Sequence, residues 1–304
     1  MLLMHVKHPV QTTIVLLSAG LIVLAGCLPL CLSEAGWLCG PEADFDGEYS
    51  VHTIDRNDRP PLTLYVKRSD APNTRKALLV AHISSADSNT AAKWAVVHWG
   101  SFLSDVGITV VAHAYNESDS AYGQFDLEDT LDVVEWLNGD GAEELGIDQV
   151  FLQGTSRGGV IAYQAAFRAG PGRLAGVIAD RGVSNFLLLN EARDLYLSGA
   201  FGEAVRRATQ LTLEWIGVLP EEDPEPWKAL SASYNLDRIA VPMLVMHGDQ
   251  DRLVPVEQAI DFVDRARQIG RDDIRLMVIE GLGHYTLGFA PDYRRAITDF
   301  ILNN

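Results

Sequence analysis

The chain has 304 residues, 47% of them hydrophobic and 21% charged, which allows one large buried core and excludes a disordered or fibrous protein. The formal net charge at pH 7 is -17, and the Lys and Arg residues form no dense run. Because such an acidic surface repels a phosphate backbone, we expect no nucleic-acid partner.

The first 26 residues have the composition of an export signal. Lys7 and the α-amino group give a short positive start, and residues 13–26 are almost wholly apolar. The run ends in the letters LAGC, which resemble the lipobox of bacterial lipoproteins. This resemblance implies cleavage directly before Cys27, a lipid on Cys27 and a membrane-anchored protein at the cell envelope, facing the periplasm or the exterior.

Two alternatives to lipidation stay open. Residues 13–32 are long and apolar enough to cross a bilayer as an uncleaved anchor, or they form an ordinary secretory signal. If Cys27 is lipidated, an even pair of cysteines remains, and in an oxidising compartment Cys31 and Cys39 could form a disulfide. No cysteine follows Cys39, so neither thiol catalysis nor a cysteine-based zinc site is expected.

After a linker over residues 27–47, we predict one catalytic domain over residues 48–304, in which short β-branched runs alternate with amphipathic stretches. Several runs are continuously apolar, as in parallel strands buried on both faces. The alternation favours an α/β fold with a mostly parallel eight-stranded sheet, and the first two strands fit an antiparallel edge hairpin. Predicted strands cover Tyr49–Ile54, Leu62–Lys67, Ala77–Ile83, Ile108–Ala114, Gln149–Gln153, Leu174–Ala179, Met243–His247 and Asp273–Glu280.

Four helices are predicted between and after these strands, at Asp126–Leu137, Arg157–Ala169, Val256–Ile269 and Asp292–Leu302. Asp126 is the predicted N-cap of the first, with Asp129 as a weak capping-box partner. Residues 182–241 interrupt the alternation as a helical insert. We expect this insert to roof a pocket over the carboxyl ends of the strands, the alternative being extra packing without substrate contact.

The pentapeptide GTSRG, residues 154–158, matches the pattern G-x-S-x-G. Alone the match is weak, but a predicted strand precedes it and a predicted helix follows it. Ser156 therefore falls on a strand-to-helix turn, where small flanking residues let the backbone turn sharply and expose the hydroxyl. We predict Ser156 as a nucleophile.

A serine nucleophile needs a base, and the base needs a carboxylate. His284 follows the last predicted strand and would lie at the same sheet edge as Ser156. Asp249 and Asp251 follow the strand Met243–His247, and Glu280 is a more distant candidate. The order nucleophile, acid, base is that of the α/β-hydrolases, but spacing does not separate Asp249 from Asp251.

The three motifs GTSRGG, HGDQDRLVP and GLGH together resemble the catalytic domain of the prolyl-oligopeptidase-like (S9) and dienelactone-hydrolase-like serine hydrolases, over roughly residues 75–302. The family pattern H-G-x-x-D-x-x-V-P implies Asp251 as the acid, beside Ser156 and His284. The resemblance also implies the α/β-hydrolase fold, an acyl-enzyme intermediate, and neither cofactor nor metal.

In this family an oxyanion hole of backbone N–H groups is expected. One donor would be Arg157, directly after the nucleophile. The second would come from the loop after the third strand, where relatives often carry His-Gly; here Ile83 replaces the glycine after His82, so Ile83 or Ser84 is the candidate. The side chains of Arg157 and Arg181 are expected in ion pairs, or alternatively on a substrate carboxylate.

The predicted activity is hydrolysis of a small ester or short peptide, by an S9-like peptidase or a carboxylesterase, since the chain has no room for the gating β-propeller of oligopeptidases. The alternative is a non-catalytic envelope lipoprotein of the same fold that binds a ligand or partner. A metal-dependent hydrolase using His82 and His113 is disfavoured, because no H-x-x-x-H or H-E-x-x-H pair exists.

Overall fold

The computed structural model describes residues 49–57, 59–69, 71–72, 74–83, 87–115, 124–191, 210, 212–284 and 291–304. All of them belong to one compact unit, Phe45–Asn304. The predicted signal, the linker, Ser84 and the three cysteines Cys27, Cys31 and Cys39 lie outside these residues. Among the described helices, none has the length and apolar character needed to cross a membrane.

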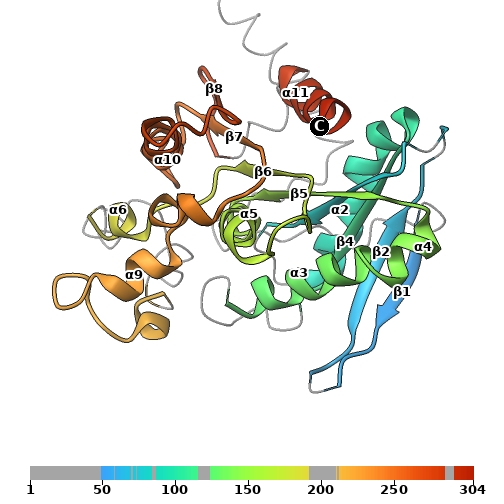
Figure 1. Cartoon of the computed structure of the whole chain (residues 1–304), viewed down its shortest axis with the longest axis horizontal. Coiled ribbons are helices and arrows are strands. Elements are labelled where there is room, and N and C mark those ends of the chain that lie inside the picture. The colour runs from blue at the N-terminus through green and yellow to red at the C-terminus, as the bar shows by residue number, and fades with distance from the viewer. Residues whose placement is uncertain are drawn as a thin grey trace, which may run out of the picture. The chain divides into compact units, whose positions relative to one another are not determined.

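Eight strands form one sheet in the order β1-β2-β4-β3-β5-β6-β7-β8 (Figure 1). The pairs β1–β2 and β2–β4 are antiparallel, and every other neighbouring pair is parallel. The predicted mostly parallel α/β sheet with an antiparallel edge hairpin is therefore confirmed. The strands are β1 Ser50–Ile54, β2 Leu62–Lys67, β3 Lys76–Ala81, β4 Ile108–His113, β5 Gln149–Thr155, β6 Gly176–Asp180, β7 Met243–Gly248 and β8 Ile274–Ile279.

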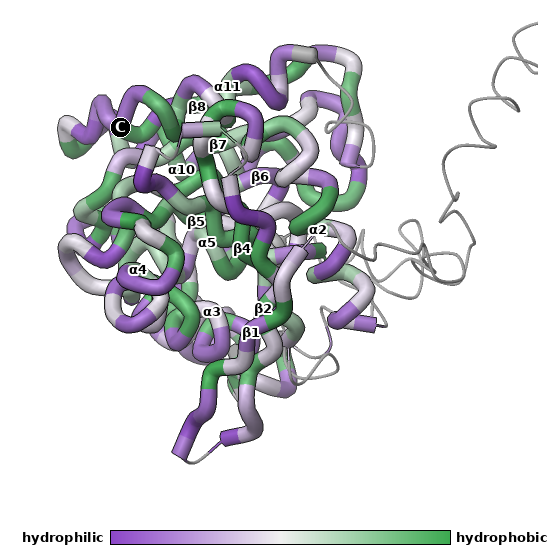
Figure 2. Tube along the Cα trace, turned by 90° about the vertical axis from the view of Figure 1, so that its right-hand side faces the viewer, coloured by the Kyte–Doolittle hydropathy of each residue, from purple (hydrophilic) through white to green (hydrophobic). Residues whose placement is uncertain are grey.

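Helices cover both faces of the sheet, which is why the central strands read as unbroken apolar runs. Along β3, Leu79 packs with the cluster beneath α3, α5 and α10, while its neighbour Leu78 packs with the cluster beneath α2 and α11. Figure 2 shows the apolar residues gathered along these central strands. The helices are α2 Ser88–Leu103, α3 Gln124–Leu137, α4 Asp140–Leu145, α5 Arg157–Arg168, α6 Phe186–Glu191, α9 Glu225–Leu230, α10 Glu257–Gln268 and α11 Pro291–Asn303.

Helix α2 has no counterpart among the predicted elements. Its buried face is mostly small, and Trp94 is 46% exposed, so the apolar periodicity is blurred. What begins the helix is a side-chain cap: the Asp87 carboxylate accepts the backbone N–H groups of Asn89 and Thr90. In the sequence, Asp87 as an N-cap residue therefore indicates this helix better than the apolar periodicity does.

The prediction that Asp126 caps the next helix is wrong. Helix α3 begins at Gln124, so Asp126 lies inside its first turn, and its buried carboxylate accepts a hydrogen bond from the Arg157 guanidinium. Asp129 does not close a capping box either, because it pairs with Arg56 from the loop after β1. Tertiary ion pairs, which sequence spacing does not reveal, use both carboxylates.

The described part of the insert contains α6, α9 and two short 3-10 helices, Ala232–Tyr234 and Leu236–Arg238. Phe186 and Trp227 from the insert form an apolar cluster with Val160 of α5 and Val254 after β7. The insert thus packs against the two segments that carry the predicted nucleophile and acid. That it roofs a substrate pocket stays a prediction, since residues 192–209 lie outside the described part of the chain.

Candidate active site

Ser156 lies on a sharp turn between β5 and α5. Its φ of 56° and ψ of −113° lie in a backbone region that residues other than glycine rarely adopt. The Ser156 N–H donates to the Asp180 carbonyl at 2.9 Å. A Cβ on Gly158 would lie 1.9 Å from the Ala81 carbonyl oxygen, so only glycine allows α5 to approach β3 this closely. The G-x-S-x-G pattern therefore follows from the sterics of the turn.

His284 connects Ser156 to Asp251. Its Nε2 lies 2.9 Å from Ser156 Oγ, and its Nδ1 lies 2.7 Å from Asp251 Oδ2. His284 is 7% exposed and Asp251 is 8% exposed, whereas Ser156 is partly exposed. Three residues from three separate loops thus meet at the carboxyl edge of the sheet, at the distances that general-base catalysis requires.

The structure separates the two aspartates that spacing alone could not. Asp251 Oδ1 accepts the backbone N–H groups of Leu253 and Val254, both at 2.9 Å, which leaves Oδ2 for His284. Asp249 instead accepts the Gly281 N–H at 2.7 Å and so holds the loop that precedes the histidine. Glu280 is exposed and has no part in this arrangement.

Asp251 is held in its ionised form. Burial opposes its ionisation, but hydrogen bonds from His247, His284 and the backbone N–H of Val254 outweigh burial and lower its pKa well below the ordinary value. His247 lies with Nε2 2.8 Å from the Val254 carbonyl oxygen and 3.4 Å from Asp251 Oδ2. His247 thus contacts both the backbone after β7 and the carboxylate of Asp251.

His82 holds the loop that is expected to supply the second oxyanion donor. Its Nδ1 donates to the Ile83 carbonyl at 2.8 Å, and burial lowers its pKa to about 3, so the ring is neutral. The Tyr115 hydroxyl donates to the His82 carbonyl at 3.0 Å. In a trans peptide the N–H points away from the carbonyl, so the Ile83 N–H faces away from Tyr115.

The expected first oxyanion donor, Arg157, is the first residue of α5. Its side chain lies against the Tyr115 ring and forms an ion pair with Asp126, in line with the expectation that this guanidinium is ion-paired. Arg181 pairs with Asp180 and is likewise buried. Because both side chains are buried, neither guanidinium lies at the surface, where it could bind a substrate carboxylate.

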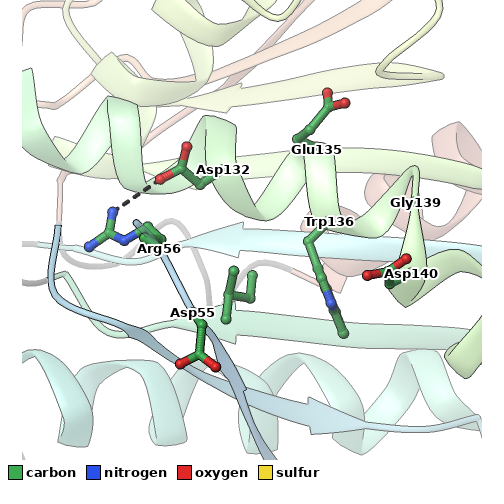
Figure 3. A pocket seen from close by; sticks show the side chains of 8 residues that line it. Asp55, Arg56, Asp132, Glu135, Trp136, Gly139 and Asp140 are labelled. Atoms are coloured by element: carbon green, nitrogen blue, oxygen red, sulfur yellow. Dashed lines mark hydrogen bonds and ion pairs between the residues drawn. The ribbon is translucent and has the colours of Figure 1, made fainter. Parts of the chain in front are cut away.

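A surface hollow of about 370 Å³ lies elsewhere, between the end of β1 and helices α3 and α4 (Figure 3). It is lined by Trp136 and several acidic side chains, of which Asp132 pairs with Arg56 and Glu135 pairs with Arg173. None of the residues near Ser156 reaches it. Within the described residues no group of His, Cys, Asp and Glu side chains could hold a metal ion.

A nucleophile elbow, a histidine and an aspartate in this chain order, on a sheet of this topology, are the arrangement of a serine hydrolase of the α/β-hydrolase fold. Comparison with known families agrees, since a sequence profile of the prolyl oligopeptidase family matches residues 106–304, more than half of the chain. The chain belongs to the prolyl oligopeptidase family.

Individual relatives include both esterases and peptidases. The chain is 38% identical over 64 residues to Esterase LipC of Mycobacterium tuberculosis, covering 21% of this chain and 16% of that protein. It is 25% identical over 150 residues to Uncharacterized peptidase YtmA of Bacillus subtilis, covering 49% and 52%. An esterase structure from Pyrococcus furiosus superposes with a TM-score of 0.61 at 19% identity, covering 86% of this chain and 94% of the other.

The chain thus spans at most about half of the curated relatives that it matches in sequence. The structural likeness, at 19% identity, establishes the fold alone.

Proposed function

We propose that this protein hydrolyses an ester or peptide bond of a small substrate through an acyl-enzyme on Ser156. The observation that supports the proposal is the continuous hydrogen-bond chain from Asp251 through His284 to Ser156. A serine hydroxyl is a poor nucleophile until a neighbouring base accepts its proton, and His284 Nε2 is within reach of that proton.

In the proposed reaction Ser156 Oγ attacks the substrate carbonyl carbon while its proton passes to His284 Nε2. The ionised Asp251 stabilises the resulting imidazolium through Nδ1. The negative charge on the carbonyl oxygen is stabilised by the N–H of Arg157 and by that of Ile83 or Ser84. His284 then protonates the leaving alcohol or amine, and a water molecule, deprotonated by His284, hydrolyses the acyl-enzyme.

A non-catalytic binding protein of the same fold is the competing function. Such a protein would not require a strained serine at hydrogen-bond distance from a histidine that is itself fixed by a buried carboxylate. The geometry therefore favours the enzyme over the binding module.

The decisive experiment is labelling of the purified protein with a fluorophosphonate probe, beside the Ser156→Ala variant. We expect the wild type to be labelled and the variant not. Equal labelling of the two proteins would refute the assignment of Ser156. Short-chain p-nitrophenyl esters and aminoacyl or prolyl p-nitroanilides, assayed in parallel, then separate an esterase from a peptidase.

We further propose that the mature protein begins at Cys27, carries a lipid there and resides at the cell envelope. The support is the LAGC sequence after an apolar stretch with a positive start. The Cys27→Ser variant should lose its lipid, which intact mass spectrometry detects. A wild-type protein whose intact mass equals that of the full-length, unmodified chain would instead indicate an uncleaved anchor.

A further inference from the structure

The dipeptide Asp180-Arg181 at the end of β6 connects the elbow to the histidine. The Asp180 carbonyl accepts the Ser156 N–H at 2.9 Å, and Arg181 Nη1 donates to the carbonyl oxygen of His284. The Arg181 N–H in turn donates to the Met246 carbonyl of β7 at 3.0 Å. One short segment therefore bonds to the backbone of both residues between which the proposed proton transfer takes place.

The two charged side chains of this segment are almost completely buried. Asp180 is fully buried, and Arg181 is 7% exposed. Asp180 Oδ2 accepts Arg181 Nη2 at 2.8 Å, the Tyr293 hydroxyl at 2.6 Å and the Thr155 hydroxyl at 3.1 Å. Because desolvation offsets much of the attraction in a buried ion pair, such a pair contributes little stability that apolar side chains could not supply.

The backbone of Arg181 is also strained. Its φ of 53° is in the left-handed region, which is sterically unfavourable for a residue with a Cβ. The strain is maintained by the hydrogen bond to Met246 and by the close packing of the next residue, Gly182, on Gly159 of α5. Strained, buried and charged residues of this kind are concentrated at functional sites.

We propose that Arg181 is a positioning residue for His284: its guanidinium, anchored on Asp180, fixes the His284 peptide so that Nε2 stays within hydrogen-bond distance of Ser156. Asp251 fixes the imidazole at Nδ1, and Arg181 fixes the backbone at the other end of the residue. Two separate restraints then define the ring position relative to Ser156 Oγ. This inference rests on the proposed function, because the position matters for the proton transfer described there.

The test compares Arg181→Met with Arg56→Met. Arg56 also forms an ion pair with a buried carboxylate, that of Asp129, and its side chain is 6% exposed, but it contacts no residue of the site. Assayed well below both melting temperatures, Arg181→Met should lower kcat by 10- to 100-fold with KM within about twofold, since a misplacement of about 1 Å costs up to about 10² in rate. Arg56→Met should leave kcat unchanged. Arg181→Lys, which keeps the charge but not the two-pronged geometry, should fall in between.

A kcat of Arg181→Met within twofold of the wild type, or an equal decrease in Arg56→Met, would overturn the proposal. Should Arg181→Met not fold, the same comparison is made between Arg181→Lys and Arg56→Lys, with an expected kcat loss of about fivefold for the first alone. Crystal structures provide a readout independent of turnover: retention of the Ser156–His284 hydrogen bond in the Arg181 variant contradicts positioning. An unlabelled wild type that keeps this hydrogen bond would contradict the proposed function instead.

Discussion

Asp249 and Asp251 lie two residues apart on one loop, yet their carboxylates have different partners. Asp251 bonds to His284 and to two backbone N–H groups of its own turn, whereas Asp249 bonds to Gly281. Their spacing from β7 gives no reason to prefer either. The choice of Asp251 came from the family pattern, and the physical reason, a turn that aims one carboxylate oxygen at the histidine, is visible only in the folded chain.

Exchange of each carboxylate for an amide should therefore affect activity unequally. Asp251→Asn removes the charge that stabilises the imidazolium and favours the wrong tautomer of His284, so we expect kcat to fall by about 10³- to 10⁴-fold. Asp249→Asn keeps an oxygen that can accept the Gly281 N–H and should cost less than about tenfold. Steady-state kinetics on one ester substrate measure both. Similar losses in the two variants would contradict the assignment of Asp251.

The roles of individual residues that act through partners distant in the sequence cannot be predicted from the sequence. Ser156 and His284 can be predicted from the sequence because each is in a short motif next to a strand. Asp180, Arg181 and Tyr293 form one network, but Tyr293 is more than a hundred residues further along the chain and in no motif. Nothing in the local sequence distinguishes such a buried network from ordinary surface charges.

At the scale of elements, strands were easier to predict than helix ends. Strands β4 and β7 are buried along their whole length, and this burial is visible in the sequence as unbroken apolar runs. The start of α3 was misplaced because its acidic first turn is typical of a cap, while its carboxylates in fact bind arginines of other elements. Local capping rules fail where tertiary ion pairs use the same side chains.

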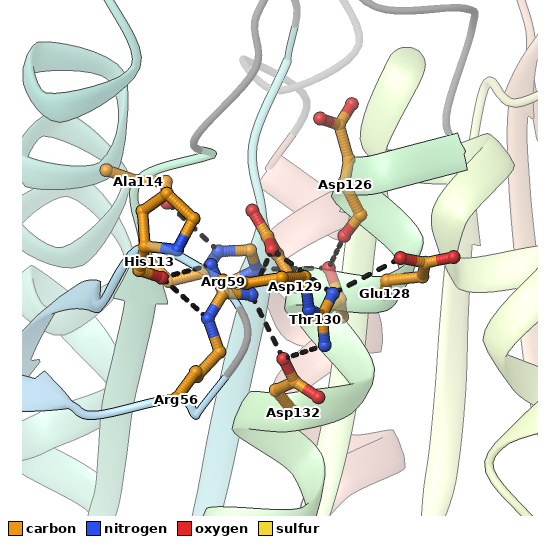
Figure 4. Close-up of polar contacts among 10 residues, drawn as sticks. Arg56, Arg59, His113, Ala114, Asp126, Glu128, Asp129, Thr130 and Asp132 are labelled. Carbon is orange, nitrogen blue, oxygen red and sulfur yellow. Dashed lines mark hydrogen bonds and ion pairs between the residues drawn. The ribbon is translucent and has the colours of Figure 1, made fainter.

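One of these pairs fixes α3 to the loop after β1 (Figure 4). Arg56 Nη1 lies 2.5 Å from Asp129 and 3.0 Å from Asp132, and the side chains of Arg56 and Asp129 are 6% and 4% exposed. Arg56→Met would leave the buried Asp129 carboxylate with only the longer ion pair to Arg59, at 3.8 Å, so we expect the free energy of unfolding to fall by up to about 3 kcal/mol. Urea unfolding followed by circular dichroism measures the loss.

Two further variants test whether that loss comes from the pair itself. Arg59→Met removes a side chain that is 31% exposed and should cost less than about 1 kcal/mol. The double variant Arg56→Met/Asp129→Leu should regain part of the stability, since no buried charge is then left without its partner. Losses that simply add in the double variant would show that the two residues do not interact.

For the whole molecule, the eight-stranded sheet was predictable because alternating strands and helices allow few arrangements. The sequence indicates where the helical insert lies but not what it does. Its packing on Val160 and Val254 depends on contacts that no periodicity specifies. The pH response of the fold could not be predicted either, because it depends on which histidines are buried.

His82 and His113 are buried in neutral form, and this should make the fold sensitive to mild acid. Burial lowers their pKa values from 6.5 to about 3 and about 4. Between pH 6.5 and pH 4 the unfolded chain therefore binds protons that the native protein does not, and stability falls as the pH falls. Each histidine should lower the free energy of unfolding by about 2 kcal/mol between pH 7 and pH 5.

Urea unfolding at a series of pH values checks this prediction, with His113→Gln as the informative variant. The variant should lose about 2 kcal/mol less than the wild type between pH 7 and pH 5, because one of the histidines that titrate in this window is absent. Thr130→Val, which removes the hydroxyl 3.0 Å from His113 Nε2 but keeps the ring, should lower stability by a similar amount at every pH. The depressed pKa of Asp251 acts in the same direction, but only below its ordinary value of 3.8, outside this window. A wild-type stability that stays constant from pH 7 to pH 5 would mean that neither histidine is buried in neutral form.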